Sequence, residues 1–191
     1  MQVLDDEKRK RILKTAAKMF ARKHYHEVRL EDIATKAGVG KGTVYTYFKS
    51  KDELHFAILF QGFAELVDKV AHEPDDDGKS AAESLESILR AIAHYAYDHP
   101  HVFELMRTSL SQGSRPKWIR KREELMHAVE RVVRRGVKNG EWRDPHPEWT
   151  GNYITALVRS VMLFGTPPKN PETLVRHMHA FVINGLAGGK R

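Results

Sequence analysis

The stretch AGVGKGTVYTYF, residues 37 to 48, places three glycines around one lysine and continues into aromatic residues. Glycines beside a lysine are typical of a loop that holds phosphate, either of a bound nucleotide or of a nucleic-acid backbone; alternatively they only close a turn. A nucleotide-binding P-loop requires G-x-x-x-x-G-K-[S/T] between a strand and a helix. Thr35 stands where the first glycine is needed, Gly42 replaces the Ser or Thr, and the preceding LEDIATKAG has a helical pattern. These three failures together argue against a nucleotide site.

The same stretch fits a helix-turn-helix, in which two short helices are joined by a glycine-bearing turn of three or four residues. Its apolar residues can form the small core that locks the two helices together: Ile33, Ala34, Val39, Val44 and Phe48. The second helix then exposes cations, hydroxyls and rings, which suit phosphates and base edges in the major groove of DNA. These exposed residues are Lys41, Gly42, Thr43, Tyr45, Thr46 and Tyr47. The pattern predicts a DNA-binding surface, although Tyr45 could instead be partly buried by packing.

Residues 11–59, RILKTAAKMFARKHYHEVRLEDIATKAGVGKGTVYTYFKSKDELHFAIL, resemble the DNA-binding region of the TetR family of bacterial regulators. The resemblance implies that Lys41, Gly42, Tyr45 and Thr46 face bases and that Thr43, Tyr47 and Lys51 meet phosphates. Two positions depart from the family pattern. Gly40 replaces the usual Ser or Thr, and Arg29 stands where a Ser or Thr commonly caps a helix and touches phosphate. We expect Arg29 to reach the phosphate directly, at the expense of the cap.

Charge is concentrated in the first quarter of the chain. Residues 1–52 contain thirteen Lys and Arg against seven Asp and Glu, a net +6 out of +7 for all 191 residues. A basic segment attached to a near-neutral body predicts binding to a polyanion, although a solvated Lys-rich helix face would have the same composition. The chain has no cysteine, no apolar run long enough to cross a membrane and no signal-peptide pattern at its start. We expect a cytoplasmic protein that is nucleoid-associated when bound to DNA.

Apolar residues recur at helical spacing nearly throughout, so the predicted fold is all-α with about nine helices. Two capping boxes, SKDE at 50–53 and SAAE at 80–83, mark helix starts, and Asn170 followed by Pro171 marks another. A further helix is expected around residues 102–110. We predict a helix-turn-helix domain over 1–49, and the resemblance to the TetR family implies that 50–191 form a helical effector-binding and dimerisation domain.

The last two predicted helices carry long apolar faces, and two of them from each subunit could form a four-helix bundle in a homodimer. Packing within one subunit is the alternative. A dimer would hold two DNA-binding helices about 34–36 Å apart, which suits a pseudo-palindromic operator. The resemblance implies that the protein is a repressor, released from this operator by a small hydrophobic or amphipathic effector. Two other classes remain as alternatives: a helical small-molecule binder that does not use DNA, and a nucleotide-dependent enzyme.

Candidate pocket residues are the aromatic and pliable side chains of the middle helices, although each of them taken singly is more often ordinary core. They are Phe63, Tyr95, Phe103, Met106, Trp118, Met126, Trp149 and Tyr153. Eleven histidines raise the question of a metal, but none forms an i, i+4 pair with another or joins a carboxylate cluster typical of zinc. We therefore predict no metal, no cofactor and no catalytic residue.

Overall fold

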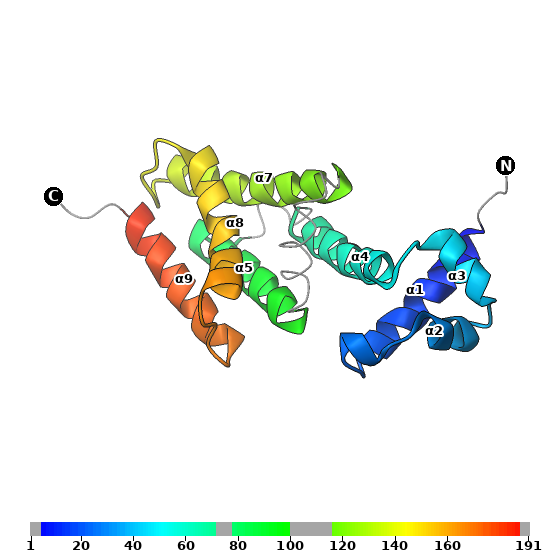
Figure 1. The fold of residues 1–191 in the computed structure, drawn as a ribbon. Helices are drawn as coiled ribbons and strands as arrows, with labels where there is room; N and C mark the ends of the chain where they lie inside the picture. Colours follow the sequence, from blue (N-terminus) through cyan, green and yellow to red (C-terminus); the bar gives the residue numbers. More distant parts are fainter. Residues whose placement is uncertain (1–4, 72–77, 100–115, 188–191) are drawn as a thin grey trace. The chain divides into compact units, whose positions relative to one another are not determined.

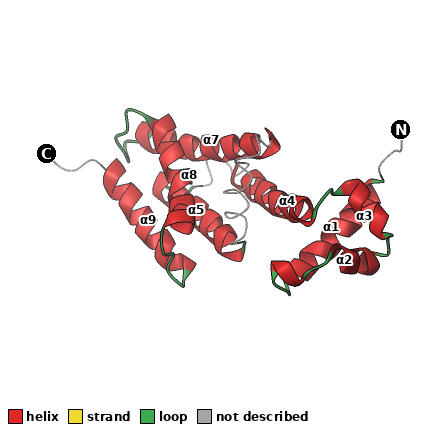
Figure 2. Cartoon of the chain, viewed as in Figure 1, coloured by secondary structure: helices red, strands yellow, loops and turns green. Residues whose placement is uncertain are grey.

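A computed structural model describes residues 5–71, 78–99 and 116–187. Over these ranges the chain forms eight α-helices and one short 3-10 helix, with no strand (Figures 1 and 2), which confirms the all-α prediction. The helix expected around 102–110 lies outside the described residues. The chain divides into two compact units, Met1–Gly62 and Phe63–Arg191. This division falls within α4 (Lys51–Ala71), later than the boundary of residue 49 expected from the sequence.

The first unit contains four elements before α4: α1 (Asp6–Phe20), η1 (Tyr25–Glu27), α2 (Leu30–Ala37) and α3 (Lys41–Tyr47). In this unit α1 packs against α2, and α2 against α3. The helix-turn-helix core predicted from spacing is confirmed, because Ile33, Ala34, Val44 and Phe48 are buried and Val39 packs against them. Asp5 caps α1 by accepting hydrogen bonds from the backbone N–H groups of Glu7 and Lys8 at 3.0 and 3.2 Å.

The second unit contains the rest of α4 and four further helices: α5 (Ala81–Asp98), α7 (Pro116–Lys138), α8 (Pro147–Phe164) and α9 (Pro171–Leu186). Here α5 packs against α7, α8 and α9, and α7 packs against α8. The predicted caps form: Ser80 and Glu83 make a capping box on α5, and the Asn170 side chain accepts from the Glu172 N–H at 2.9 Å.

Two glycines of the second unit allow close packing. A Cβ on Gly151 of α8 would lie 3.1 Å from the Met126 carbonyl oxygen of α7, so glycine lets the two helices approach. A Cβ on Gly136 would come within 2.7 Å of Trp142 Cδ2, so glycine makes room for this buried indole ring.

Candidate nucleic-acid interface and ligand pocket

The α2–α3 turn depends on a left-handed residue. Gly38 adopts φ 63° and ψ 39° after α2, a conformation that favours glycine, and the Val39 N–H then bonds to the Ala34 carbonyl at 3.0 Å. Gly40 is the N-cap of α3, and it supplies no side-chain hydrogen bond. Because Val44 and Phe48 point into the core, the opposite side of α3 is left at the surface.

The outer side of α3 carries a compact group of residues that the sequence predicted to face bases. Lys41, Gly42, Tyr45 and Thr46 are all exposed, and 44% of the Tyr45 surface is accessible. Thr46 Oγ1 donates to the Gly42 carbonyl at 3.0 Å, which holds the threonine in one rotamer. Thr43 is half-buried at the edge of the group. The arrangement offers a cation, a phenol ring and a methyl group on one helix face.

Lys41 is held in place by a carboxylate of α2. Its ammonium nitrogen lies 2.6 Å from Glu31 Oε1, and this hydrogen bond raises the pKa of Lys41 and lowers that of Glu31. Both side chains are exposed, so solvent screens the pair. The glutamate therefore orients the lysine, and it also presents a negative charge beside it. This partner had no signal in the sequence motif.

Two residues expected at phosphates are engaged within the first unit. The Tyr47 hydroxyl donates to the Asp5 carbonyl at 2.9 Å and accepts from the Asp5 N–H at 3.0 Å. Lys51 Nζ donates to the carbonyl oxygens of Tyr25 and Val28 at 2.9 and 3.1 Å, and lies 4.2 Å from the centre of the Tyr25 ring. Both side chains therefore tie the start of α1 or the segment before α2 to the rest of the unit.

Arg29 stands at the N-cap of α2 with an extended backbone, φ −104° and ψ 145°, and makes no capping hydrogen bond. The loss of the cap expected from the sequence is thus confirmed. Its side chain is exposed.

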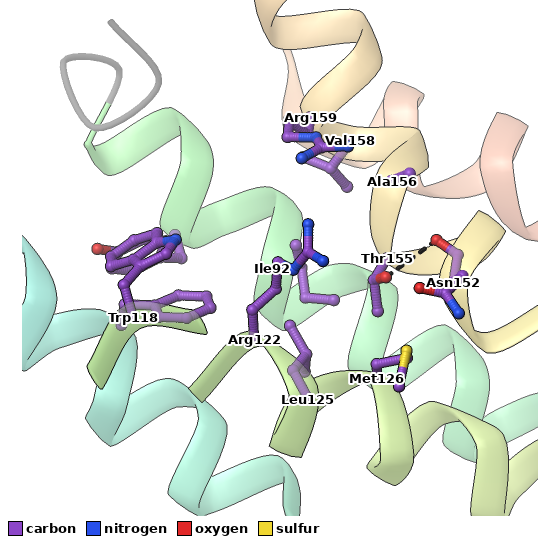
Figure 3. A pocket seen from close by; sticks show the side chains of 12 residues that line it. Ile92, Trp118, Arg122, Leu125, Met126, Asn152, Thr155, Ala156, Val158 and Arg159 are labelled. Atoms are coloured by element: carbon purple, nitrogen blue, oxygen red, sulfur yellow. Dashed lines mark hydrogen bonds between the residues drawn. The ribbon is translucent and has the colours of Figure 1, made fainter. Parts of the chain in front are cut away.

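The second unit contains a pocket with a cavity volume of about 100 Å³, bounded by α4, α5, α7 and α8 (Figure 3). Four of the eight residues predicted for a pocket line it: Phe63, Tyr95, Trp118 and Met126. The other lining residues are Ile92, Arg122, Leu125, Asn152, Thr155, Ala156, Val158 and Arg159.

The remaining four predicted pocket residues are placed differently. Trp149 and Tyr153 of α8 are 52% and 65% exposed and do not line the pocket. Phe103 and Met106 lie outside the described residues.

One end of the pocket is aromatic. Phe63 stacks on Trp118 with ring centroids 4.4 Å apart, and Tyr95 lies 5.9 Å from Phe63. Burial raises the pKa of the Tyr95 hydroxyl, so this wall stays uncharged at neutral pH. The polar lining residues are Arg122 from α7 and Asn152, Thr155 and Arg159 from α8.

These polar residues were not predicted, although helical spacing holds a signal for them. Arg122 stands four residues from both Trp118 and Met126, and therefore shares their face of α7. Asn152, Thr155 and Arg159 likewise follow one another at three and four residues along α8, on the pocket side of the helix.

In the parts of the chain that the structure describes, no three His, Asp or Glu side chains are arranged to hold a metal. His94, which the sequence pairs with Asp98 on one helix face, instead contacts Glu172 of α9 at 2.8 Å, and Arg90 bonds to the same carboxylate at 3.2 Å. These bonds lower the pKa of Glu172, the His94 contact most strongly, and they tie α5 to the start of α9. None of the described helices combines the length and apolarity that crossing a membrane requires.

Two family models match the chain. Residues 12–58 match bacterial regulatory proteins of the tetR family, and residues 78–186, more than half of the chain, match the tetracyclin repressor-like C-terminal domain. The HTH-type transcriptional regulator YhgD of Bacillus subtilis is 26% identical over 188 residues, covering 95% of this chain and 97% of the relative. The fatty acid metabolism regulator protein of the same organism is 23% identical, covering 92% and 88%.

Solved structures agree in fold. A TetR/AcrR-family regulator from Thermobifida fusca superposes with a TM-score of 0.70 at 22% identity, covering 98% of this chain and all of the other. FadR from Bacillus subtilis, solved in complex with stearoyl-CoA, gives 0.67 at 18% identity, covering 92% and 98%. The chain therefore belongs to the TetR family of bacterial regulatory proteins and is a helix-turn-helix transcriptional regulator.

Proposed function

We propose that this regulator is a repressor that binds a pseudo-palindromic double-stranded operator as a homodimer, with α3 of each copy in the major groove of one half-site. The observation that carries the proposal is the outer face of α3. An exposed lysine, tyrosine and threonine surround a glycine there, with the core residues turned away. A ring of 44% accessibility beside a cation suits base edges and phosphates better than water.

The residues divide by role. Lys41, Gly42, Tyr45 and Thr46 meet bases, while Arg29 and Thr43 meet phosphates. Tyr47 and Lys51 are also assigned to the phosphate backbone. Their internal hydrogen bonds support a second function, which is to fix α3 in position within the first unit.

The dimer is proposed to form through α8 and α9. Large apolar side chains are exposed along both helices: Trp149, Tyr153, Phe164 and Phe181. Phe164 is 83% exposed, and such a residue gains most from burial against a second copy. Two α8–α9 pairs related by two-fold symmetry would form a four-helix bundle.

The effector is proposed to be a small hydrophobic or amphipathic molecule bound in the pocket of the second unit. The apolar and aromatic lining supports this, as does the likeness to a fatty acid metabolism regulator and to a structure solved with stearoyl-CoA. Binding of the effector would favour a dimer arrangement in which the two α3 helices no longer fit the operator. The protein would act at the nucleoid by binding alone, with no chemical step and no cofactor.

Selection of duplexes from a random pool, followed by fluorescence anisotropy at increasing salt, tests the DNA assignment. We expect an enriched pseudo-palindrome with half-sites about one helical turn apart, and an affinity that falls steeply with salt. Arg29→Ala should flatten the salt slope by about one ion, whereas Lys138→Ala, which removes an exposed cation at the end of α7, should not. Equal, salt-independent affinity for every duplex would overturn the proposal.

A further inference from the structure

The pocket contains two arginines without partners in the part of the chain that the structure describes. Arg122 and Arg159 are the only charged residues among the described residues that line it. Within residues 5–71, 78–99 and 116–187, neither guanidinium makes a hydrogen bond or an ion pair. Other arginines of the same unit are bonded: Arg134 lies 2.6 Å from Glu130, and Arg90 lies 2.7 Å from Glu86.

The sequence around the two arginines explains why they stay unpaired. A helical arginine usually finds a carboxylate three or four residues away. Arg122 has Trp118, Ile119, Leu125 and Met126 at these positions, and Arg159 has Thr155, Ala156, Met162 and Leu163. Among the described residues that line the pocket, none is acidic. Arg159 is half-buried beside apolar walls, where a guanidinium gains more from an anion than one in bulk water does.

The apolar and the polar residues that line the pocket differ in their exposure to solvent. Phe63, Leu125 and Val158 are buried, whereas Arg122 and Asn152 reach solvent. Figure 3 shows Arg122 extending from α7 toward the centre of the pocket and Arg159 on its α8 side. The pocket therefore combines buried apolar walls with an exposed arginine, Arg122, and a half-buried one, Arg159.

From these observations, and resting on the proposed effector role of this pocket, we infer that its ligand is an anionic amphiphile. The acidic head group binds Arg122 and Arg159, and the apolar body packs against the Phe63–Trp118 stack. Guanidinium groups recognise carboxylate and phosphate through paired N–H donors, so either head group satisfies the site.

The size of the cavity limits the length of the apolar chain that the ligand can carry. A volume of about 100 Å³ is smaller than the roughly 300–1,000 Å³ of sites for drug-sized ligands. A short chain fits as the pocket stands, and a longer one requires the walls to move. Met126 is the pliable side chain in the lining, and its three rotatable bonds allow this adjustment.

Isothermal titration calorimetry with ligands of one chain length isolates the head group. We expect the wild-type protein to bind octanoate at least about tenfold more tightly than 1-octanol, because hydrogen bonds to charged groups carry this much discrimination. Octylammonium should bind most weakly. Equal affinity for octanoate and 1-octanol, or no binding of either, would overturn the inference.

Variants assign the preference to the two arginines. Arg122→Gln with Arg159→Gln should reduce the octanoate preference to within about twofold while leaving 1-octanol affinity unchanged. The control is Arg120→Gln on the same helix, since Arg120 is exposed, lies 3.8 Å from Glu124 and does not line the pocket. A preference that survives in the double variant would contradict the assignment.

Two further measurements separate this inference from the proposed function. Octanoyl-CoA offers the same chain with phosphates in the head group; tighter binding than octanoate would assign the natural ligand to CoA thioesters, and weaker binding to free acids. The operator complex is then titrated with octanoate. Selective binding of octanoate without operator release supports the ligand class and refutes the release mechanism. Release by 1-octanol at the same concentrations refutes the ligand class and keeps the mechanism.

Discussion

Lys41 and Lys51 of the first unit differ from Arg122 and Arg159 of the second in what they are bonded to. In the first unit, Lys41 contacts Glu31 and Lys51 contacts two backbone carbonyls. In the second, Arg122 and Arg159 line an apolar pocket and have no partner among the described residues. Internal partners fix the position of a charge that will meet a large, regular polyanion. Unpartnered charges beside apolar walls instead indicate that the missing partner is a ligand.

The two units also differ in how far apart in sequence their parts lie. The core of the first unit is built within residues 12–54. The pocket of the second draws its walls from α4, α5, α7 and α8, between Phe63 and Arg159. A change in the core of the first unit should therefore weaken DNA binding first, and a change in the core of the second unit should weaken ligand binding first. The following substitutions test this separation.

The largest effect is expected from Phe48→Ala, because Phe48 is 2% exposed in the core of the first unit. Removing a buried ring costs about 3–5 kcal/mol of the free energy of unfolding, measured by urea denaturation. Operator affinity should be lost while octanoate binding is retained. The control, Tyr45→Ala, removes an exposed ring and should change stability little. Parallel loss of octanoate binding in Phe48→Ala would show that the units do not fold separately.

Gly136→Ala is the corresponding change in the second unit. The added methyl group would overlap the buried Trp142 ring, which should lower the free energy of unfolding by about 1–3 kcal/mol. Octanoate binding should weaken while affinity for non-specific DNA is unchanged. Gly185→Ala in α9 is the matched control, since no atom lies within 4 Å of its Cβ position. A similar loss in both variants would show that overlap with Trp142 is not the cause.

Gly42→Ala separates stability from DNA binding. No protein atom lies within 4 Å of a Cβ at Gly42, and alanine favours a helix by about 0.8–1.0 kcal/mol over glycine. We therefore expect a more stable protein whose operator affinity is about tenfold lower, because the methyl group stands between α3 and the bases. Unchanged affinity in anisotropy measurements would place Gly42 away from the DNA.

The smallest effect is expected from Arg29→Ser, which restores the missing cap of α2. The free energy of unfolding should rise by about 1 kcal/mol. Arg29→Ala removes the same charge without supplying a cap, and should give no increase. Both variants should lower the salt slope of DNA binding by about one ion if Arg29 meets a phosphate. An equal rise in stability in both would attribute the gain to charge rather than capping.

Local patterns made the first unit predictable. Gly38, the core positions Ile33 to Phe48 and the uncapped Arg29 all follow from spacing and residue type over short distances. The partners Glu31 and Asp5 were not predicted, because side-chain pairing across a turn or over 42 residues leaves no periodic trace.

Of the twelve residues that line the pocket, only four were predicted, for a different reason. Aromatic residues on middle helices were chosen by type, and type alone does not distinguish Trp118, which lines the pocket, from Trp149, which is exposed on α8. That distinction depends on how α7 and α8 are rotated against each other, and Gly151 contributes to it by allowing their close approach. The arginines were overlooked because a charged residue on a helix is ordinarily solvated.

Operator selection with wild-type protein and Tyr45→Ala in parallel tests most directly whether α3 reads the base sequence. Tyr45 is the exposed ring at the centre of the proposed contact surface. We predict that both proteins select pseudo-palindromes of the same half-site spacing, and that Tyr45→Ala changes the preferred base at one matched position in each half-site. Selection of an unchanged sequence with uniformly lower affinity, or enrichment of no sequence by the wild type, would contradict the account.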